Sequence, residues 1–167
     1  MNTTVYFAKC NPEAIIPSKR IEDAGFDIYA CFDEDYIIIP PHETKLIPTG
    51  IASVCDSDYC FVLKERGSTG TKGLGQRCGV IDSGFRGEWF VPITNENFYT
   101  IVIHKSNCDP FSIPELTSIF KTYPYEKAIA QALVIPVPRT EAKEITLDEL
   151  NSFESERGTG ALGSSQK

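Results

Sequence analysis

The sequence feature that most constrains the fold is a succession of short runs rich in β-branched and aromatic residues. Turn-forming residues separate these runs, as at Pro40-Pro41 and Asn95-Glu96-Asn97. Many short strands with few helical periods predict an all-β sandwich or barrel-like fold. The expected strands are 4–8, 36–39, 45–48, 59–64, 88–94, 98–104 and 128–137.

Helical signals are few and fall in the second half of the chain. Thr146 and Glu149 have the spacing of a capping box, which predicts a short helix ending near Phe153. A second short helix is expected over 114–121, because Pro114 suits the first turn of a helix.

Length and charge limit the classes of partner. The chain has 167 residues, about one domain, and a net charge of −7. This charge argues against general nucleic-acid binding, which requires a basic surface. A nucleotide substrate remains compatible with it, because a few arginines and backbone amides hold phosphates locally. An acidic protein that binds a polyanion gains from a divalent cation, so Mg²⁺ is expected as cofactor.

The sequence predicts a cytoplasmic protein that binds no membrane. It contains no apolar stretch of the ~20 residues needed to span a bilayer, and residues 1–6 lack the layout of a signal peptide. The six cysteines include no C-x-x-C pair, and neither histidine has a partner at ligand spacing. Reduced thiols are therefore expected, and a zinc site is not.

Two segments in the middle of the chain carry candidate chemistry. The glycine-rich stretch 66–75 is either a mobile surface loop or a phosphate cradle to which Arg66 and Ser68 contribute. Asp82 follows an apolar pair at a strand end, where it is either a turn residue or a general base acting on water. Phe85 either stacks on a nucleoside or fills core space.

The last stretch, 154–167, is polar and rich in glycine and serine. It is either a frayed tail or a flexible arm that closes over phosphates. Arg157, the small residues after it, and the hydroxyls of Ser164 and Ser165 are the groups that suit such an arm.

Five segments together, in this order, resemble the trimeric dUTPase family. The segment Gly79-Val80-Ile81-Asp82-Ser83-Gly84-Phe85-Arg86-Gly87-Glu88 is similar to its third motif and is specific by itself. The other four are Ala24-Gly25-Phe26-Asp27-Ile28-Tyr29-Ala30, Arg66-Gly67-Ser68-Thr69-Gly70, Ala128-Ile129-Ala130-Gln131-Ala132 and 157–165. The stretch 66–86 looks most like members from Gram-positive bacteria and their phages.

The resemblance implies a jelly-roll-like distorted β-barrel with one short helix and a flexible C-terminal arm. The β-domain would cover 1–153, with an insertion at 105–126, and the arm would cover 154–167. Three identical subunits would share three active sites, with the arm of one subunit reaching a neighbour. The aromatic insertion is either a packing extension or a surface for a protein partner.

The resemblance also implies the reaction, hydrolysis of dUTP to dUMP and pyrophosphate. Asp82 would activate water for attack on the α-phosphorus, and Mg²⁺ would be held through the phosphates and water with no protein ligand. Phe85, where the family usually has tyrosine, would pack under the deoxyribose and exclude a 2′-hydroxyl. The substrate-binding residues implied are Arg66, Gly67, Ser68, Gln76, Gly79, Val80, Ile81, Phe85, Gln131, Arg157, Ser164 and Ser165, with Asp27 bracing the site.

Three further positions depart from the family pattern. Gly67 stands where serine usually follows the arginine, Ala128 where arginine or lysine is common, and Leu162 where phenylalanine usually stacks over the base. The loss of an aromatic stack, worth about 0.5–1.5 kcal/mol, predicts weaker clamping of the base with activity retained.

Two alternatives to dUTP hydrolysis remain. A dCTP deaminase of the same fold would need a glutamate-based site, and no segment matches one. A catalytically weak or moonlighting protein that binds a regulatory partner would not need Asp82, Gln131 and Arg157 together.

Overall fold

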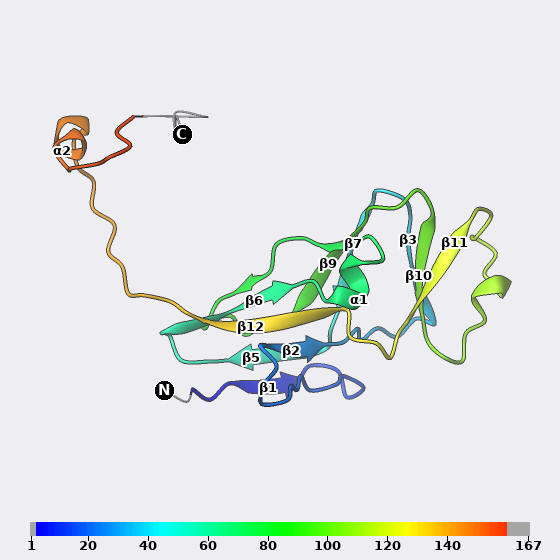
Figure 1. The fold of residues 1–167 in the computed structure, drawn as a ribbon. Coiled ribbons are helices and arrows are strands. Elements are labelled where there is room, and N and C mark those ends of the chain that lie inside the picture. Colours follow the sequence, from blue (N-terminus) through cyan, green and yellow to red (C-terminus); the bar gives the residue numbers. More distant parts are fainter. Residues whose placement is uncertain (1–2, 160–167) are drawn as a thin grey trace. The chain divides into compact units, whose positions relative to one another are not determined.

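The chain divides into two compact units, which are described separately. The structure is a computed structural model, and it describes residues 3–159. The first unit ends at Val137 and the second begins at Pro138 (Figure 1). The expected boundary between a β-domain and an arm at residue 154 lies within the second unit, and it stays a prediction.

The first unit is built almost entirely of short strands. One helical turn, α1 (Gly67–Gly70), and one 3₁₀ turn, η1 (Pro110–Ser112), interrupt them. The strands are β1 (Tyr6–Lys9), β2 (Gly25–Ile28), β3 (Tyr36–Ile39), β4 (Thr44–Pro48), β5 (Ile51–Val54), β6 (Tyr59–Lys64), β7 (Leu74–Gln76), β8 (Val80–Ile81), β9 (Phe90–Asn95), β10 (Thr100–His104), β11 (Phe120–Pro124) and β12 (Ala130–Pro136).

These strands pair into four small sheets. Their orders are β1-β5, β11-β10-β3, β2-β12-β6-β8 and β4-β9-β7. Every pairing is antiparallel except that of β10 with β11, which is parallel. Figure 1 shows β2, β12 and β6 running alongside one another. The all-β prediction is confirmed, although the strands described do not close into a barrel.

The insertion at 105–126 contains a strand where a helix was expected. The prediction of a helix over 114–121 is wrong, because β11 begins at Phe120 and pairs with β10 along its full length. Tyr123 lies opposite Ile103 and is buried, whereas the adjacent Pro124 is exposed. Pairing and burial in the tertiary structure therefore override the weak local signal of Pro114.

An aromatic cluster forms the centre of the core. The ring centroid of Trp89 lies 4.9 Å from that of Phe61 and 5.7 Å from that of Phe7, both in edge-on geometry. Trp89 and Phe61 are fully buried, so the cluster joins β1, β6 and the segment that enters β9. Among the described residues, the indole Nε1–H of Trp89 has no hydrogen-bond partner. An unsatisfied buried donor costs roughly 1–3 kcal/mol, which the burial of the ring must offset.

A buried amide connects the end of β9 to a second sheet. Asn95 is fully buried, and its Nδ2 donates to the carbonyl oxygens of Ile39 (2.9 Å) and Tyr99 (2.7 Å). Both amide protons are therefore satisfied inside the core. The contact fixes β9 against the sheet that contains β3, β10 and β11.

In its described part, residues 138–159, the second unit contains one short helix, α2 (Leu147–Asn151). The predicted capping box is confirmed: Thr146 Oγ1 accepts from the backbone of Glu149 at 3.2 Å, and Glu149 Oε2 accepts from the backbone of Thr146 at 2.7 Å. The hydrogen bonds from Thr146 lower the pKa of the Glu149 carboxyl. The helix ends slightly before the expected position near Phe153. Across residues 3–159, no helix is long and apolar enough to cross a membrane.

We predict that Trp89→Ala lowers the free energy of unfolding by about 3–5 kcal/mol, because it removes a fully buried ring and leaves a cavity. Denaturant unfolding measures this loss. Ile119→Ala is the control, because that side chain is 80% exposed and its truncation is expected to cost about 0.5 kcal/mol or less. Equal costs for the two variants would contradict the placement of the core.

Candidate active site

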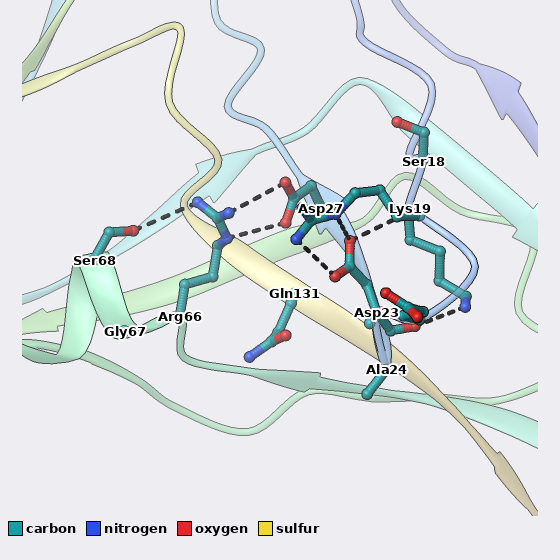
Figure 2. A pocket seen from close by; sticks show the side chains of 12 residues that line it. Ser18, Lys19, Asp23, Ala24, Asp27, Arg66, Gly67, Ser68 and Gln131 are labelled. Carbon is teal, nitrogen blue, oxygen red and sulfur yellow. Dashed lines mark hydrogen bonds and ion pairs between the residues drawn. The ribbon is translucent and has the colours of Figure 1, made fainter.

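A large open cavity lies between the segment before β2, β2 itself, the start of α1 and β12 (Figure 2). Its volume is about 770 Å³. Five residues that the sequence analysis assigned to the active site line it, namely Asp27, Arg66, Gly67, Ser68 and Gln131. The other lining residues are Ser18, Lys19, Arg20, Glu22, Asp23, Ala24 and Gly25.

The centre of this cavity is a two-point ion pair between Arg66 and Asp27. Arg66 Nε lies 3.0 Å from Asp27 Oδ1, and Nη2 lies 3.2 Å from Oδ2, so the guanidinium plane faces the carboxylate. Figure 2 shows the two groups pointing toward each other. Such a pairing fixes orientation as well as distance. The predicted bracing role of Asp27 has this contact as its physical basis.

Sheet pairing brings Gln131 into the same cavity. Gln131 on β12 lies directly opposite Asp27 on β2, and its Nε2 donates to the carbonyl oxygen of Glu65 at 2.8 Å. The close approach of this side chain leaves little space for a larger residue at position 25. A Cβ on Gly25 would lie 3.0 Å from Gln131 Oε1 and 3.1 Å from its Cβ.

The α1 turn positions Ser68 beside the guanidinium of Arg66. Arg66 occupies the N-cap position, and Thr69 Oγ1 accepts from the Arg66 backbone N–H at 3.1 Å. Arg66 Nη1 in turn lies 3.4 Å from Ser68 Oγ. A Cβ at Gly67 would meet no atom within 4 Å, so a serine side chain at this position would also fit.

The loop before β2 forms the rim of the cavity. Lys19 Nζ donates to the carbonyl oxygen of Asp23 at 2.7 Å, and Arg20 Nε lies 2.9 Å from Asp23 Oδ2. Hydrogen bonds from the side chain and backbone of Arg20 lower the pKa of the Asp23 carboxyl, and the same ion pair raises the pKa of Arg20. These contacts tie the two ends of the loop together.

The first cavity has no excess positive charge. Its three cationic side chains are Lys19, Arg20 and Arg66, and its three carboxylates are Glu22, Asp23 and Asp27, so the formal sum is zero. A triphosphate bound here therefore needs further cationic groups from elsewhere.

A second cavity, of about 590 Å³, is formed by the bend between β7 and β8, residues 76–81, which we call the hairpin although the two strands belong to different sheets. Gln76, Gly79, Val80 and Ile81, all implied as substrate-binding by the family resemblance, line it together with Val62, Leu63, Lys64, Cys78 and Phe90. No residue lines both cavities. Nine of the residues assigned to a single active site are thus divided between two cavities that share no lining residue.

The hairpin has a sharp bend that only glycine accommodates. Gly79 has a φ of +122°, and a Cβ there would lie 2.7 Å from both Leu63 Cβ and Gln76 Nε2. The carbonyl oxygen of Gly79 accepts from the Leu63 N–H at 2.8 Å. Gln76 Nε2 donates to the carbonyl oxygen of Arg77 at 2.9 Å and also to that of Cys78. These bonds hold the backbone of the hairpin in a fixed shape.

Asp82 and Phe85 lie immediately after this hairpin, at the surface. The Phe85 N–H donates to the Asp82 carbonyl oxygen at 3.0 Å, so the backbone forms a turn. The Asp82 side chain is exposed, and Phe85 is 44% exposed, which excludes a core-filling role for that ring in the single chain. Phe85 lies over Gly87, where an added Cβ would stand 2.6 Å from the ring. Asp82 can therefore be a turn residue through its backbone and still present its side-chain carboxylate for a reaction.

The remaining predicted residues belong to the second unit or lie outside the described residues. Arg157 is described, and its N–H donates to Ser155 Oγ at 3.3 Å. Ser164, Ser165 and Leu162 lie outside the described residues. Among residues 3–159, no group of three or more His, Cys, Asp or Glu side chains is arranged to hold a metal ion. The expectation that Mg²⁺ is held through phosphates and water, with no protein ligand, stays a prediction.

The sequence analysis did not assign two sets of residues that contact the site. One is the cavity rim of Lys19, Arg20 and Asp23, for which the only signal was two adjacent basic residues. The other is Tyr123, whose hydroxyl lies 3.4 Å from Ser68 Oγ. Tyr123 comes from the insertion, and its sequence context carried no sign of proximity to Ser68.

Comparison with known proteins finds relatives over most of this chain. The family model described as dUTPase matches residues 11–108. The chain is 34% identical over 163 residues to the deoxyuridine 5'-triphosphate nucleotidohydrolase of Nautilia profundicola, covering 95% of this chain and 96% of that protein. It is 32% identical over 145 residues to the enzyme of the same name from Neisseria meningitidis serogroup A, covering 84% and 80%.

Solved structures share the fold. The dUTPase of Staphylococcus bacteriophage 80alpha with dUPNHPP aligns with a TM-score of 0.74 at 23% identity, covering 97% of this chain and 98% of that one. The D95N dUTPase of phage phi11, described with a structural Mg(II) ion, aligns with a TM-score of 0.68 at 20% identity, covering 85% and 96%. Relatives thus come from Gram-negative bacteria as well as staphylococcal phages, and the expected closeness to Gram-positive members is not confirmed.

We predict that Arg20→Ala raises the pKa of Asp23 toward its ordinary value near 3.8, because the variant loses the side-chain hydrogen bonds and the charge of Arg20, while the backbone N–H of residue 20 still donates to the carboxylate. In the wild type the contribution of the carboxylate to stability is present above its ordinary pKa and is lost as the pH falls through the lowered pKa, and the variant lacks the part of this contribution that the Arg20 side chain provides. Carbon-detected NMR titration measures the shift. Glu149, whose pKa depends on Thr146, should titrate unchanged, and an unchanged Asp23 would contradict the ion pair.

Proposed function

The chain belongs to the dUTPase family, and from this premise we propose that it hydrolyses dUTP to dUMP and pyrophosphate. The observation that carries the proposal is the rigid Gly79 hairpin, which presents backbone groups to a cavity and ends at the exposed carboxylate of Asp82. The segment proposed to recognise the nucleobase and the candidate proton acceptor, Asp82, thus lie next to each other in the chain. The names of the curated relatives favour hydrolysis over deamination.

The hairpin supplies recognition of the base and sugar. Backbone groups of 79–81 would pair with the uracil edge, and Gln76 would hold their geometry through its bonds to neighbouring carbonyls. As the family resemblance implies, this backbone would be too tight to admit a 5-methyl group on the base. Phe85, exposed beside Gly87, would pack under the deoxyribose and exclude a 2′-hydroxyl.

Asp82 is the general base of the proposed reaction. Its carboxylate accepts a proton from water as the water oxygen attacks the α-phosphorus. The bond from the α-phosphorus to the bridging oxygen breaks, and pyrophosphate leaves with the bonding electron pair. Mg²⁺ bound to the phosphates supplies charge neutralisation. Exposure of Asp82 in the single chain gives water and substrate access to the carboxylate.

The first cavity holds the phosphates. Arg66 and Ser68 contribute donors, Gly67 leaves room for a close approach, and Gln131 stands beside Asp27. Because this cavity is formally neutral, the substrate charge is balanced by Mg²⁺ and by Arg157. The arm that carries Arg157, Ser164 and Ser165 would close over the β- and γ-phosphates.

We also propose that the active protein is a homotrimer with shared sites. Base-reading residues and phosphate-binding residues line different cavities of one chain, so a complete site would pair the hairpin of one copy with the Arg66 cavity of another. A cytoplasmic location and the absence of nucleic-acid and membrane partners stay predictions. A protein partner at 105–126 also stays a prediction; Phe111, 83% exposed beside Phe120, lies in that segment.

We predict that Asp82→Asn lowers kcat for dUTP by about 10²–10⁴-fold, since the amide cannot accept the proton of water. Affinity for a non-hydrolysable dUTP analogue should change by less than about 3-fold, because the side-chain shape is retained. Pyrophosphate release and calorimetry measure the two quantities. Asp35→Asn, at another exposed carboxylate, is the matched control and should retain full activity. An active Asp82→Asn enzyme would show that the base is a different group.

A further inference from the structure

We propose that Tyr123, contributed by the insertion, is a positioning residue for the phosphate-binding pair Arg66 and Ser68. This inference rests on the proposed function, because it concerns how the phosphate side of that site is held. It assigns the strand β11 a part in substrate binding in addition to its packing.

Tyr123 is buried with its hydroxyl directed at two oxygens next to the first cavity. Its side chain is 1% exposed. The hydroxyl donates to the carbonyl oxygen of Ala128 at 2.8 Å and lies 3.4 Å from Ser68 Oγ. A buried tyrosine whose hydroxyl is this close to a site hydroxyl contributes more than ring burial.

Arg66 contacts the same two oxygens from the other side. Its Nη1 lies 3.4 Å from Ser68 Oγ and 3.5 Å from the carbonyl oxygen of Ala128. Its Nε and Nη2 are held by Asp27. The guanidinium is therefore fixed at one edge by a carboxylate and at the other by oxygens that Tyr123 also contacts.

The number of protons that each group can donate fixes the donor and the acceptor of every hydrogen bond in this network. Arginine only donates, so Ser68 Oγ accepts from Arg66. Tyr123 uses its one proton on Ala128, so between the two hydroxyls Ser68 is the donor and Tyr123 the acceptor. Hydrogen bonds that run in one direction strengthen one another. Removing the Tyr123 hydroxyl would leave the Ser68 proton without this acceptor and the Ala128 carbonyl without its shortest donor.

The insertion supplies this tyrosine through its parallel pairing with β10. Residues 100–104 and 120–124 pair in register, which places Tyr123 opposite Ile103 and turns its side chain to the buried face. Ala128 follows Tyr123 by five positions in the chain, so the strand and the first cavity are also connected through a short stretch of chain. Ala128 offers no polar side chain, and its carbonyl oxygen is contacted by both Arg66 and Tyr123.

The test removes the hydroxyl and keeps the ring. Tyr123→Phe is expected to weaken binding of an imido analogue of dUTP by about 3–10-fold, the range for loss of one buried hydrogen bond. Binding of deoxyuridine, which has no phosphate, should not change. Tyr125→Phe is the matched control, because it removes a hydroxyl two residues away that faces Cys31 and should leave both affinities unchanged.

A double-mutant cycle with Ser68→Ala separates positioning from simple packing. If Tyr123 acts through Ser68, adding Tyr123→Phe to Ser68→Ala should cost less than about 2-fold further affinity. Full additivity of the two losses, or wild-type analogue affinity in Tyr123→Phe, would overturn the proposal. A loss of deoxyuridine affinity equal to that for the analogue would also overturn it, since that pattern indicates general destabilisation.

A ligand-free measurement keeps this inference distinct from the proposed function. In the absence of nucleotide, NMR should show the Arg66 guanidinium protons exchanging with solvent at least about 3-fold faster in Tyr123→Phe than in Tyr125→Phe. If wild-type protein neither binds nor hydrolyses dUTP, the proposed function fails while this exchange difference still supports positioning. Equal exchange in the two variants, with hydrolysis intact in wild type, overturns the positioning role alone.

Discussion

The rest of the site depends on the ion pair between Arg66 and Asp27. It joins Arg66, the N-cap of α1 two residues after β6, to the middle of β2, and β12 lies hydrogen-bonded between β2 and β6. Both side chains are about one-third exposed, so the pair contributes little to stability by itself. Its importance is geometric, because two parallel contacts fix the guanidinium plane. The orientation of this plane in turn sets where Ser68 and the groups proposed to donate hydrogen bonds to phosphates lie.

The same ion pair leaves the first cavity of one chain without net positive charge. Asp27 cancels the charge of Arg66, and the rim carboxylates cancel those of Lys19 and Arg20. Under the proposed function, binding of a triphosphate would depend on charge that the substrate brings as Mg²⁺ and that Arg157 provides. The base-reading hairpin lines a separate cavity, so both electrostatics and geometry favour a site assembled from several copies.

Sequence reasoning succeeded where local chemistry decides the structure. Strands such as β3 and β6 were predicted with their observed bounds because β-branched and aromatic runs end at strong turn signals. It missed β2, β5, β7, β8 and β11, which are short or contain small residues, and at β11 long-range pairing with β10 decides the fold. The site residues came from motif resemblance. Neither their division between two cavities nor the contact of Tyr123 with Ser68 has a local signal.

The most direct test of the account mixes two inactive variants, Asp82→Asn and Arg66→Gln, after denaturation and refolding together. If each site combines Asp82 of one copy with Arg66 of another, random 1:1 assembly leaves about one-quarter of the sites with both native residues. The account therefore predicts about one-quarter of wild-type dUTP hydrolysis in the mixture and almost none in either variant alone. A mixture that forms hybrid oligomers and remains inactive would contradict it.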